Sequence, residues 1–96
     1  MKAMLYNSDT ETLELTDKKL KTAKPHTLLI YNDDVNTFDF VIDSLVEVCG
    51  HDEIQAEQCT LLIHYKGKCD VKLGTFKQLK PLKDELLNRG LSAVIE

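Results

Sequence analysis

The stretch TLLIYNDDVNTFDF, residues 27–40, leads from an apolar run into two adjacent carboxylates, Asp33 and Asp34, and then turns apolar again. The run HTLLIY has the length and composition of a buried strand. After the acids, Thr37 stands where a helix N-cap is expected, and apolar residues recur at helical spacing from Phe38 onward. A short polar turn thus joins a buried strand to a helix with one buried face.

Residues 50–67 contain residue types that are typical of helix ends. Gly50 is expected to cap the C-terminus of the first helix. Asp52, with Gln55 three residues later in capping-box position, predicts a second helix that runs through EIQAEQCTLLIHYK to Gly67. Because so few residues separate the two helices, we expect them to pack as a hairpin or a sharp corner.

The last third of the chain predicts a strand, a helix and a strand. KCDVKL alternates as an edge strand does, with Val71 and Leu73 on one face. Thr75 starts the helical stretch FKQLKPLKDELLNRG, which ends at Gly90 and in which Pro81 predicts a break between a short turn and the main helix. LSAVIE predicts the final strand. The order β-α-α-β-α-β indicates one small α+β domain, with a three-stranded antiparallel sheet covered by helices.

Composition and charge narrow the class of protein. The 96 residues suffice for one core, and a hydrophobic share of 43% and a charged share of 29% are ordinary globular values. A net charge of -4 repels a phosphate backbone, so no nucleic acid partner is expected. No apolar run approaches the roughly 20 residues that span a bilayer, and the N-terminus lacks the apolar stretch of a secretion signal. We therefore expect a cytoplasmic protein with no membrane partner.

The chain divides near Pro25 into an extension and a folded domain. Residues 1–24 mix acidic and polar residues, turn basic in KKLKTAK, and contain too few clustered apolar residues for a core. We expect a flexible N-terminal extension over 1–24 and a core domain over 25–96. The three cysteines have no CxxC spacing and are odd in number, which disfavours a disulfide framework or a structural zinc site and predicts buried apolar residues.

The acidic turn admits two interpretations that need no partner protein. Asx side chains cap backbone N–H groups in turns, which accounts for one or two of its polar residues. In a calcium loop, Asn32, Asp34, Asn36 and Asp43 would stand at ligand positions. That interpretation fails because Thr37 occupies the place of the glycine that the sharp turn requires, and Asp43 lies inside the predicted helix. No metal site is expected.

Two further interpretations use His64. Asp33 or Asp34 as a general base with His64 as partner would suit an acid–base enzyme, but the chain lacks a nearby serine nucleophile, a metal constellation and a phosphate loop. No catalytic residue and no cofactor are therefore expected. The acidic oxygens, the Asn32 carbonyl and a neutral imidazole are instead suitable acceptors for an ammonium group. His64 shares a helix face with Thr60, so these acceptors are expected at the mouth of a small apolar pocket.

LLIYNDDVNTFDFVIDSL, followed by EQCTLLIHYKGK, resembles ClpS, the adaptor family that delivers N-degron substrates to a Clp AAA+ unfoldase and its protease. The resemblance runs from about Thr27 to Lys68 and resumes in LSAVIE. It implies a fold similar to the C-terminal domain of the ribosomal stalk protein. It also implies a protein that binds N-terminal Leu, Phe, Tyr or Trp in one pocket and docks on the N-terminal domain of the unfoldase. A monomer is expected. Residues 1–24 resemble the flexible extension that the family uses during delivery.

The resemblance also assigns roles to individual residues. The substrate's α-amino group would be held by Asn32, Asp33 and His64, with Asp34 and Asn36 at the same rim. The side-chain pocket would be lined by Phe38, Val41, Thr60, Ile63 and Leu91. Phe38 and Thr60 depart from the family, in which Met is common at both positions, so the preference among the four N-terminal residues stays open. The region 69–90 is shorter than in typical members, so its unfoldase contacts are not transferred.

A non-catalytic interaction module of the same fold, with a purely structural acidic turn, remains the alternative. The two hypotheses predict different effects of Asp33→Ala. In an adaptor the substitution abolishes peptide capture with little loss of stability, whereas in a structural turn it lowers stability.

Overall fold

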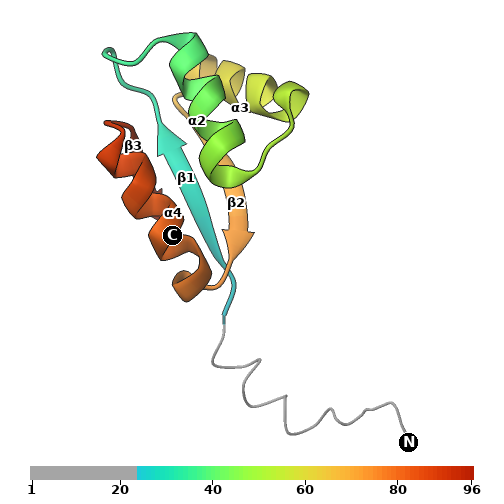
Figure 1. Ribbon diagram of the computed structural model, residues 1–96, viewed down its shortest axis with the longest axis vertical. Helices are drawn as coiled ribbons and strands as arrows, with labels where there is room; N and C mark the ends of the chain where they lie inside the picture. The colour runs from blue at the N-terminus through green and yellow to red at the C-terminus, as the bar shows by residue number, and fades with distance from the viewer. Residues whose placement is uncertain (1–23) are drawn as a thin grey trace, which may run out of the picture.

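The computed structural model describes residues 24–96, and their elements follow the order β-α-α-β-α-β (Figure 1). The elements are β1 His26–Tyr31, α2 Phe38–Cys49, α3 Glu53–Lys66, β2 Lys68–Gly74, α4 Phe76–Asn88 and β3 Ser92–Ile95. This order confirms the fold class predicted from the sequence, a small α+β domain with three antiparallel strands. Apart from Lys24, the expected extension lies outside the described residues. No helix within 24–96 is long and apolar enough to cross a membrane.

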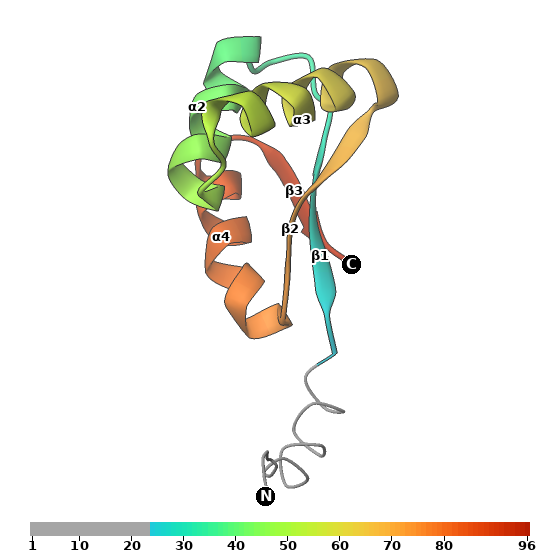
Figure 2. The same cartoon turned by 90° about the vertical axis from the view of Figure 1, so that its right-hand side faces the viewer.

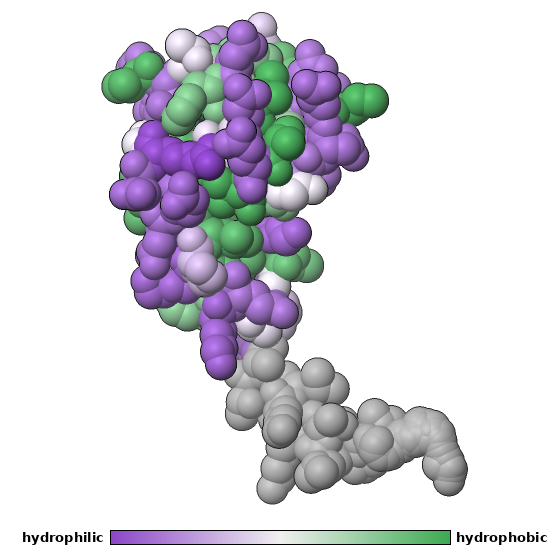
Figure 3. All heavy atoms as spheres, in the orientation of Figure 1, coloured by the Kyte–Doolittle hydropathy of each residue, from purple (hydrophilic) through white to green (hydrophobic). Residues whose placement is uncertain are grey.

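The sheet has the strand order β2-β1-β3, with β1 paired antiparallel to both neighbours. The helices pack on one side of it, as Figure 2 shows, and the core lies between the two layers. Leu28 and Ile30 of β1 point into this core and are 0% and 1% exposed. On the face seen in Figure 3, polar side chains surround a narrower strip of apolar ones. The burial of this central strand explains the three consecutive apolar residues Leu28, Leu29 and Ile30 at its centre.

The first two helices begin and end where the sequence predicts. The Thr37 hydroxyl accepts a hydrogen bond from the Phe40 N–H at 3.1 Å, and the Asp52 carboxylate accepts one from the Gln55 N–H at 2.8 Å. Gly50 ends α2 with a φ of 72°, a left-handed conformation that glycine adopts without a steric penalty. These caps fix the short connection across which α2 and α3 pack against each other.

Helix α4 corrects the prediction of a break at Pro81, because it runs without interruption from Phe76 to Asn88. Pro81 lies in the second turn of α4. Its missing N–H removes one helical hydrogen bond, the bond to the carbonyl of Lys77, which is an exposed residue. A capping box between Thr75 and Gln78 holds the turn before it. Burial of Leu79 and Leu86, which are 1% and 0% exposed, fastens the helix on both sides of the proline.

Strand β2 corrects the expected alternation. The pairing register with β1 shifts between Leu28 and Leu29, so that Val71 is an extra residue without a partner. Val71 is 5% exposed, the Lys72 ammonium donates to the Cys49 carbonyl at 3.3 Å, and Leu73 is 70% exposed. The bulge places Val71 and Lys72 on the helix-covered side and turns Leu73 to the other face, so the prediction that Val71 and Leu73 share a face was wrong.

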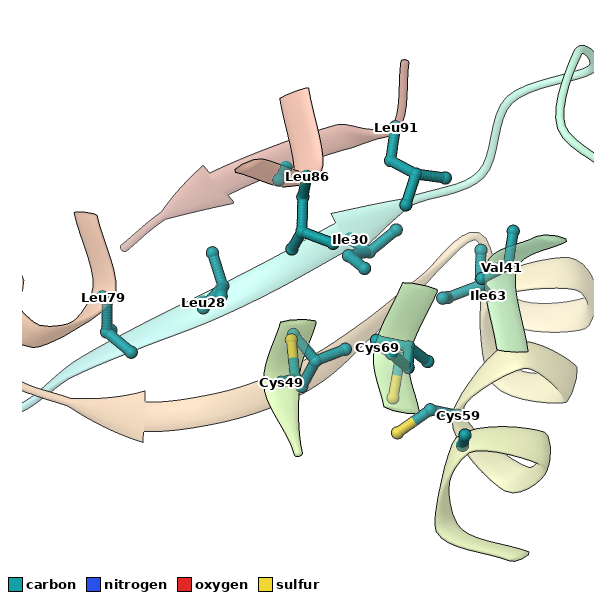
Figure 4. Close-up of a cluster of buried hydrophobic side chains, with 14 residues drawn as sticks. Leu28, Ile30, Val41, Cys49, Cys59, Ile63, Cys69, Leu79, Leu86 and Leu91 are labelled. Atoms are coloured by element: carbon teal, nitrogen blue, oxygen red, sulfur yellow. The ribbon is translucent and has the colours of Figure 1, made fainter. Parts of the chain in front are cut away.

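The cysteines are free and buried, as the sequence predicts. They come from α2, α3 and β2, and Figure 4 shows the sulfur atoms of Cys59 and Cys69 directed toward the same part of the core. Burial raises the pKa of the Cys49 thiol to about 11. Burial, together with the neighbouring Cys59, raises the pKa of Cys69 to about 12. Cys49 and Cys69 therefore pack as neutral, small apolar groups.

Candidate functional site

The NDDVN turn between β1 and α2 is organised by the Asp33 carboxylate. One carboxylate oxygen, Oδ1, accepts hydrogen bonds from the backbone N–H groups of Val35 and Asn36, both at 2.9 Å. The other oxygen, Oδ2, accepts one from the Asn36 side-chain amide at 2.9 Å. Partial burial raises the pKa of Asp33, but the bonds from the Asn36 backbone, the Asn36 side chain and the Val35 backbone outweigh it and lower that pKa. Asp33 is thus part of the turn itself.

Two further contacts anchor this turn to distant parts of the chain. The Asn36 side-chain amide also donates to the Gly90 carbonyl at 2.9 Å, which fastens the turn to the end of α4. At the start of the turn, the Asn32 N–H donates to the Gly67 carbonyl at 2.8 Å, next to the end of α3. The sequence did not reveal the roles of Gly67 and Gly90, because every residue carries a backbone carbonyl and its use as an acceptor leaves no mark on residue type.

Beside the turn, α2 and α3 enclose a hollow of about 400 Å³. It is lined by Asn32, Asp33, Asp34, Asn36, Phe38, Val41, Thr60, Ile63 and His64. All nine belong to the ten residues that the sequence and the resemblance place at the site. Val41, Thr60 and Ile63 are 7%, 3% and 4% exposed and form its floor, whereas the polar residues and Phe38 form the rim. Figure 4 shows Val41 and Ile63 close together, contributed by different helices.

Leu91 is the tenth expected residue. It is 3% exposed and belongs to the same buried core cluster as Val41 and Ile63, and its place in the side-chain pocket stays a prediction. Gly90, with a φ of 90°, ends α4 in a turn in which the Leu91 N–H donates to the Leu86 carbonyl at 3.0 Å. Figure 4 shows the Leu91 side chain directed toward the Ile30 end of β1.

The rim residues differ in whether their polar atoms already have partners. The side chains of Asp33 and Asn36 are hydrogen-bonded within the turn. Those of Asn32, Asp34 and His64 are exposed and have no hydrogen-bond partner among residues 24–96. The His64 ring meets the Tyr65 ring edge-on, with centroids 5.0 Å apart and planes at 81°. Three polar groups at the mouth of an apolar hollow are therefore open to a ligand.

The family model described as ATP-dependent Clp protease adaptor protein ClpS matches residues 21–93. The chain belongs to the ClpS family. A ClpS protein of Campylobacter jejuni is 36% identical over 93 residues, which cover 91% of this chain and 95% of that protein. One of Hydrogenovibrio crunogenus is 35% identical over 68 residues, which cover 71% of this chain and 65% of the relative. Both relatives are named ATP-dependent Clp protease adapter protein ClpS.

A solved ClpS structure shares the fold. Agrobacterium tumefaciens ClpS2 bound to L-phenylalaninamide aligns with a TM-score of 0.74 at 20% identity, over 77% of this chain and 96% of that one. The ClpS fold therefore accounts for the described domain, with helices on one side of a three-stranded sheet.

Proposed function

We propose that this ClpS-family chain is a non-catalytic adaptor that binds proteins by a free, bulky N-terminal residue and delivers them to a Clp AAA+ unfoldase and its protease. The observation that most directly supports this proposal is that the hollow has an apolar floor and a rim whose hydrogen-bond acceptors are free to bind a ligand. An N-terminal residue has the matching division, with an ammonium group at one end and an apolar side chain at the other. L-Phenylalaninamide, the ligand of the Agrobacterium protein, combines a free amine with an aromatic side chain in the same way.

The ligand's ammonium group has three donors, and Asn32, Asp34 and His64 each offer an acceptor that needs no rearrangement of the turn. Hydrogen bonds to a charged group contribute about 1.5–3 kcal/mol each. Burying a large apolar side chain on the floor contributes roughly 1.5–3 kcal/mol. With three such bonds, and after the entropy cost of about 4 kcal/mol or more for association, roughly 2–8 kcal/mol remains, so dissociation constants of about micromolar or weaker follow. In this proposal Asp33 acts mainly by shaping the rim.

Specificity for a free N-terminus follows from the groups left unpaired. Acetylation removes the charge and two of the three N–H donors of the ligand's amine. The acceptors at the rim are then desolvated without a hydrogen-bond partner, which costs about 1–3 kcal/mol for each of them. A β-branched residue such as valine carries its bulk at Cβ, where the Phe38 ring narrows the mouth, so we expect weak binding.

The test is fluorescence anisotropy of labelled peptides that differ only at residue one, with Leu, Phe, Tyr, Trp, Val or Met, each with a free or an acetylated amine. Free-amine bulky residues should bind and acetylated ones should not. Asp34→Ala and His64→Ala should weaken binding at least tenfold, while His26→Ala, at the opposite end of β1, serves as the control. If no free-amine peptide binds, or if acetylation has no effect, the proposal is refuted.

The alternative interaction module requires that the acidic turn be purely structural. The bonds of Asp33 support that role for one residue, so Asp33→Ala is expected to disturb the turn under either hypothesis. Asp34 separates the hypotheses, because its exposed side chain has no partner within 24–96. Loss of peptide binding in Asp34→Ala with unchanged unfolding free energy favours the adaptor, whereas unchanged binding favours the module.

A further inference from the structure

The floor of the hollow contains one hydroxyl group. Of its three buried side chains, Val41 and Ile63 are hydrocarbon, while Thr60 carries an oxygen and is only 3% exposed. The Thr60 hydroxyl donates to the Ala56 carbonyl one turn earlier in α3, at an Oγ1 to O distance of 2.7 Å. Its single proton is therefore committed. The Thr60 oxygen still has lone pairs, so it can act toward a ligand only as a hydrogen-bond acceptor.

An acceptor at the bottom of an apolar pocket discriminates between ligands of the same shape. Tyrosine and phenylalanine differ by one hydroxyl, and a buried hydroxyl without a partner is unfavourable. In a floor made only of hydrocarbon, tyrosine would lose its bond to water and gain nothing in return. The Thr60 oxygen supplies the missing partner, because the phenol has a proton to donate. Leucine and phenylalanine have no group that uses this oxygen.

The spacing along α3 suits this contact. His64 at the rim and Thr60 at the floor are four residues apart, so they lie on one face of the helix, separated by a rise of about 6 Å along its axis. The phenol oxygen of tyrosine lies slightly farther than this from its own Cα. A ligand whose amine is held at His64 and whose ring runs along α3 thus brings its hydroxyl to the depth of Thr60.

We propose that Thr60 is a specificity-determining residue that favours tyrosine over phenylalanine as the first residue of the ligand, by accepting a hydrogen bond from its phenol. This inference rests on the proposed function, since it concerns the same pocket. One neutral hydrogen bond corresponds to a roughly two- to twelvefold difference in affinity. The preference is therefore expected to be moderate, with phenylalanine still bound.

The experiment measures the dissociation constants of the full chain for peptides that begin with Tyr, Phe or 4-methylphenylalanine. The methyl analogue resembles tyrosine in size but has no proton to donate. Wild-type protein should bind the Tyr peptide roughly two- to twelvefold more tightly than the other two. Thr60→Val keeps the branched shape without the hydroxyl and should abolish the Tyr preference, so that the Phe peptide binds at least as tightly as the Tyr peptide, whereas Thr60→Ser should retain the preference.

The outcomes separate the two proposals. Equal binding of the three peptides by the wild-type protein would overturn the role of Thr60, and this comparison does not depend on the folding of any variant. A Tyr preference that survives in Thr60→Val would overturn it as well. If none of the peptides binds, the proposed function itself fails, and the assignment of Thr60 fails with it.

Discussion

Replacing Asn36 with alanine removes both hydrogen bonds that its side-chain amide donates, one to Asp33 and one to the Gly90 carbonyl, each 2.9 Å long. A bond to a charged acceptor contributes about 1.5–3 kcal/mol and one to a neutral carbonyl about 0.5–1.5 kcal/mol. Because the contacts are partly solvated, the lower ends apply. We expect the free energy of unfolding to fall by about 2 kcal/mol, measured by urea denaturation with an unchanged slope.

Peptide binding should weaken in the same variant, because Asn36 holds the turn that presents Asp34. If the binding-competent turn falls to between a third and a tenth of the population, the apparent affinity drops by about three- to tenfold. Asn88→Ala is the matched control, since Asn88 is an exposed amide at the end of α4 without a side-chain hydrogen bond within 24–96. If Asn36→Ala stays within about 0.5 kcal/mol of the wild type and binds peptide equally well, the anchoring argument is refuted.

Three further results are expected. Because the folded pKa of Asp33 lies below its ordinary value of 3.8, its ionised form stabilises the fold above that pH, and the contribution is lost as the pH falls through the folded pKa. Urea titrations should therefore show Asp33→Asn to be destabilised at pH 7, by a difference that shrinks below about pH 4; a constant difference would contradict the bonds of the turn. With pKa values of about 11 and about 12, Cys49 and Cys69 should resist iodoacetamide at pH 8 in the native protein and react in urea, as mass spectrometry would reveal. A protein without residues 1–24 should retain peptide binding but lose stimulated degradation by the unfoldase and protease, and degradation at the full rate would make the extension a passive linker.

The element order was predictable because local signals agree with the tertiary structure. Thr37, Gly50 and Asp52 each satisfy backbone groups at a helix end, and such a need is met within a few residues of sequence. The family resemblance then supplied the members of the site, nine of which line one hollow.

The errors arose where distant contacts outweigh a local preference. Burial of Leu79 and Leu86 offsets the cost of Pro81, and the bulge at Val71 depends on pairing with a strand about forty residues earlier in the chain.

The bond between Asn36 and the Gly90 carbonyl has a consequence for synthesis on the ribosome. It joins residues 54 positions apart, so the acceptor is synthesised well after the turn. Strand β1 also lacks one of its two neighbours until β3 has left the exit tunnel. Since a domain of this kind folds as a unit, an unfinished chain cannot hold the turn in place. We expect the pocket to become competent for capture only after β3 has left the exit tunnel, so that nascent chains without α4 and β3 do not engage other proteins.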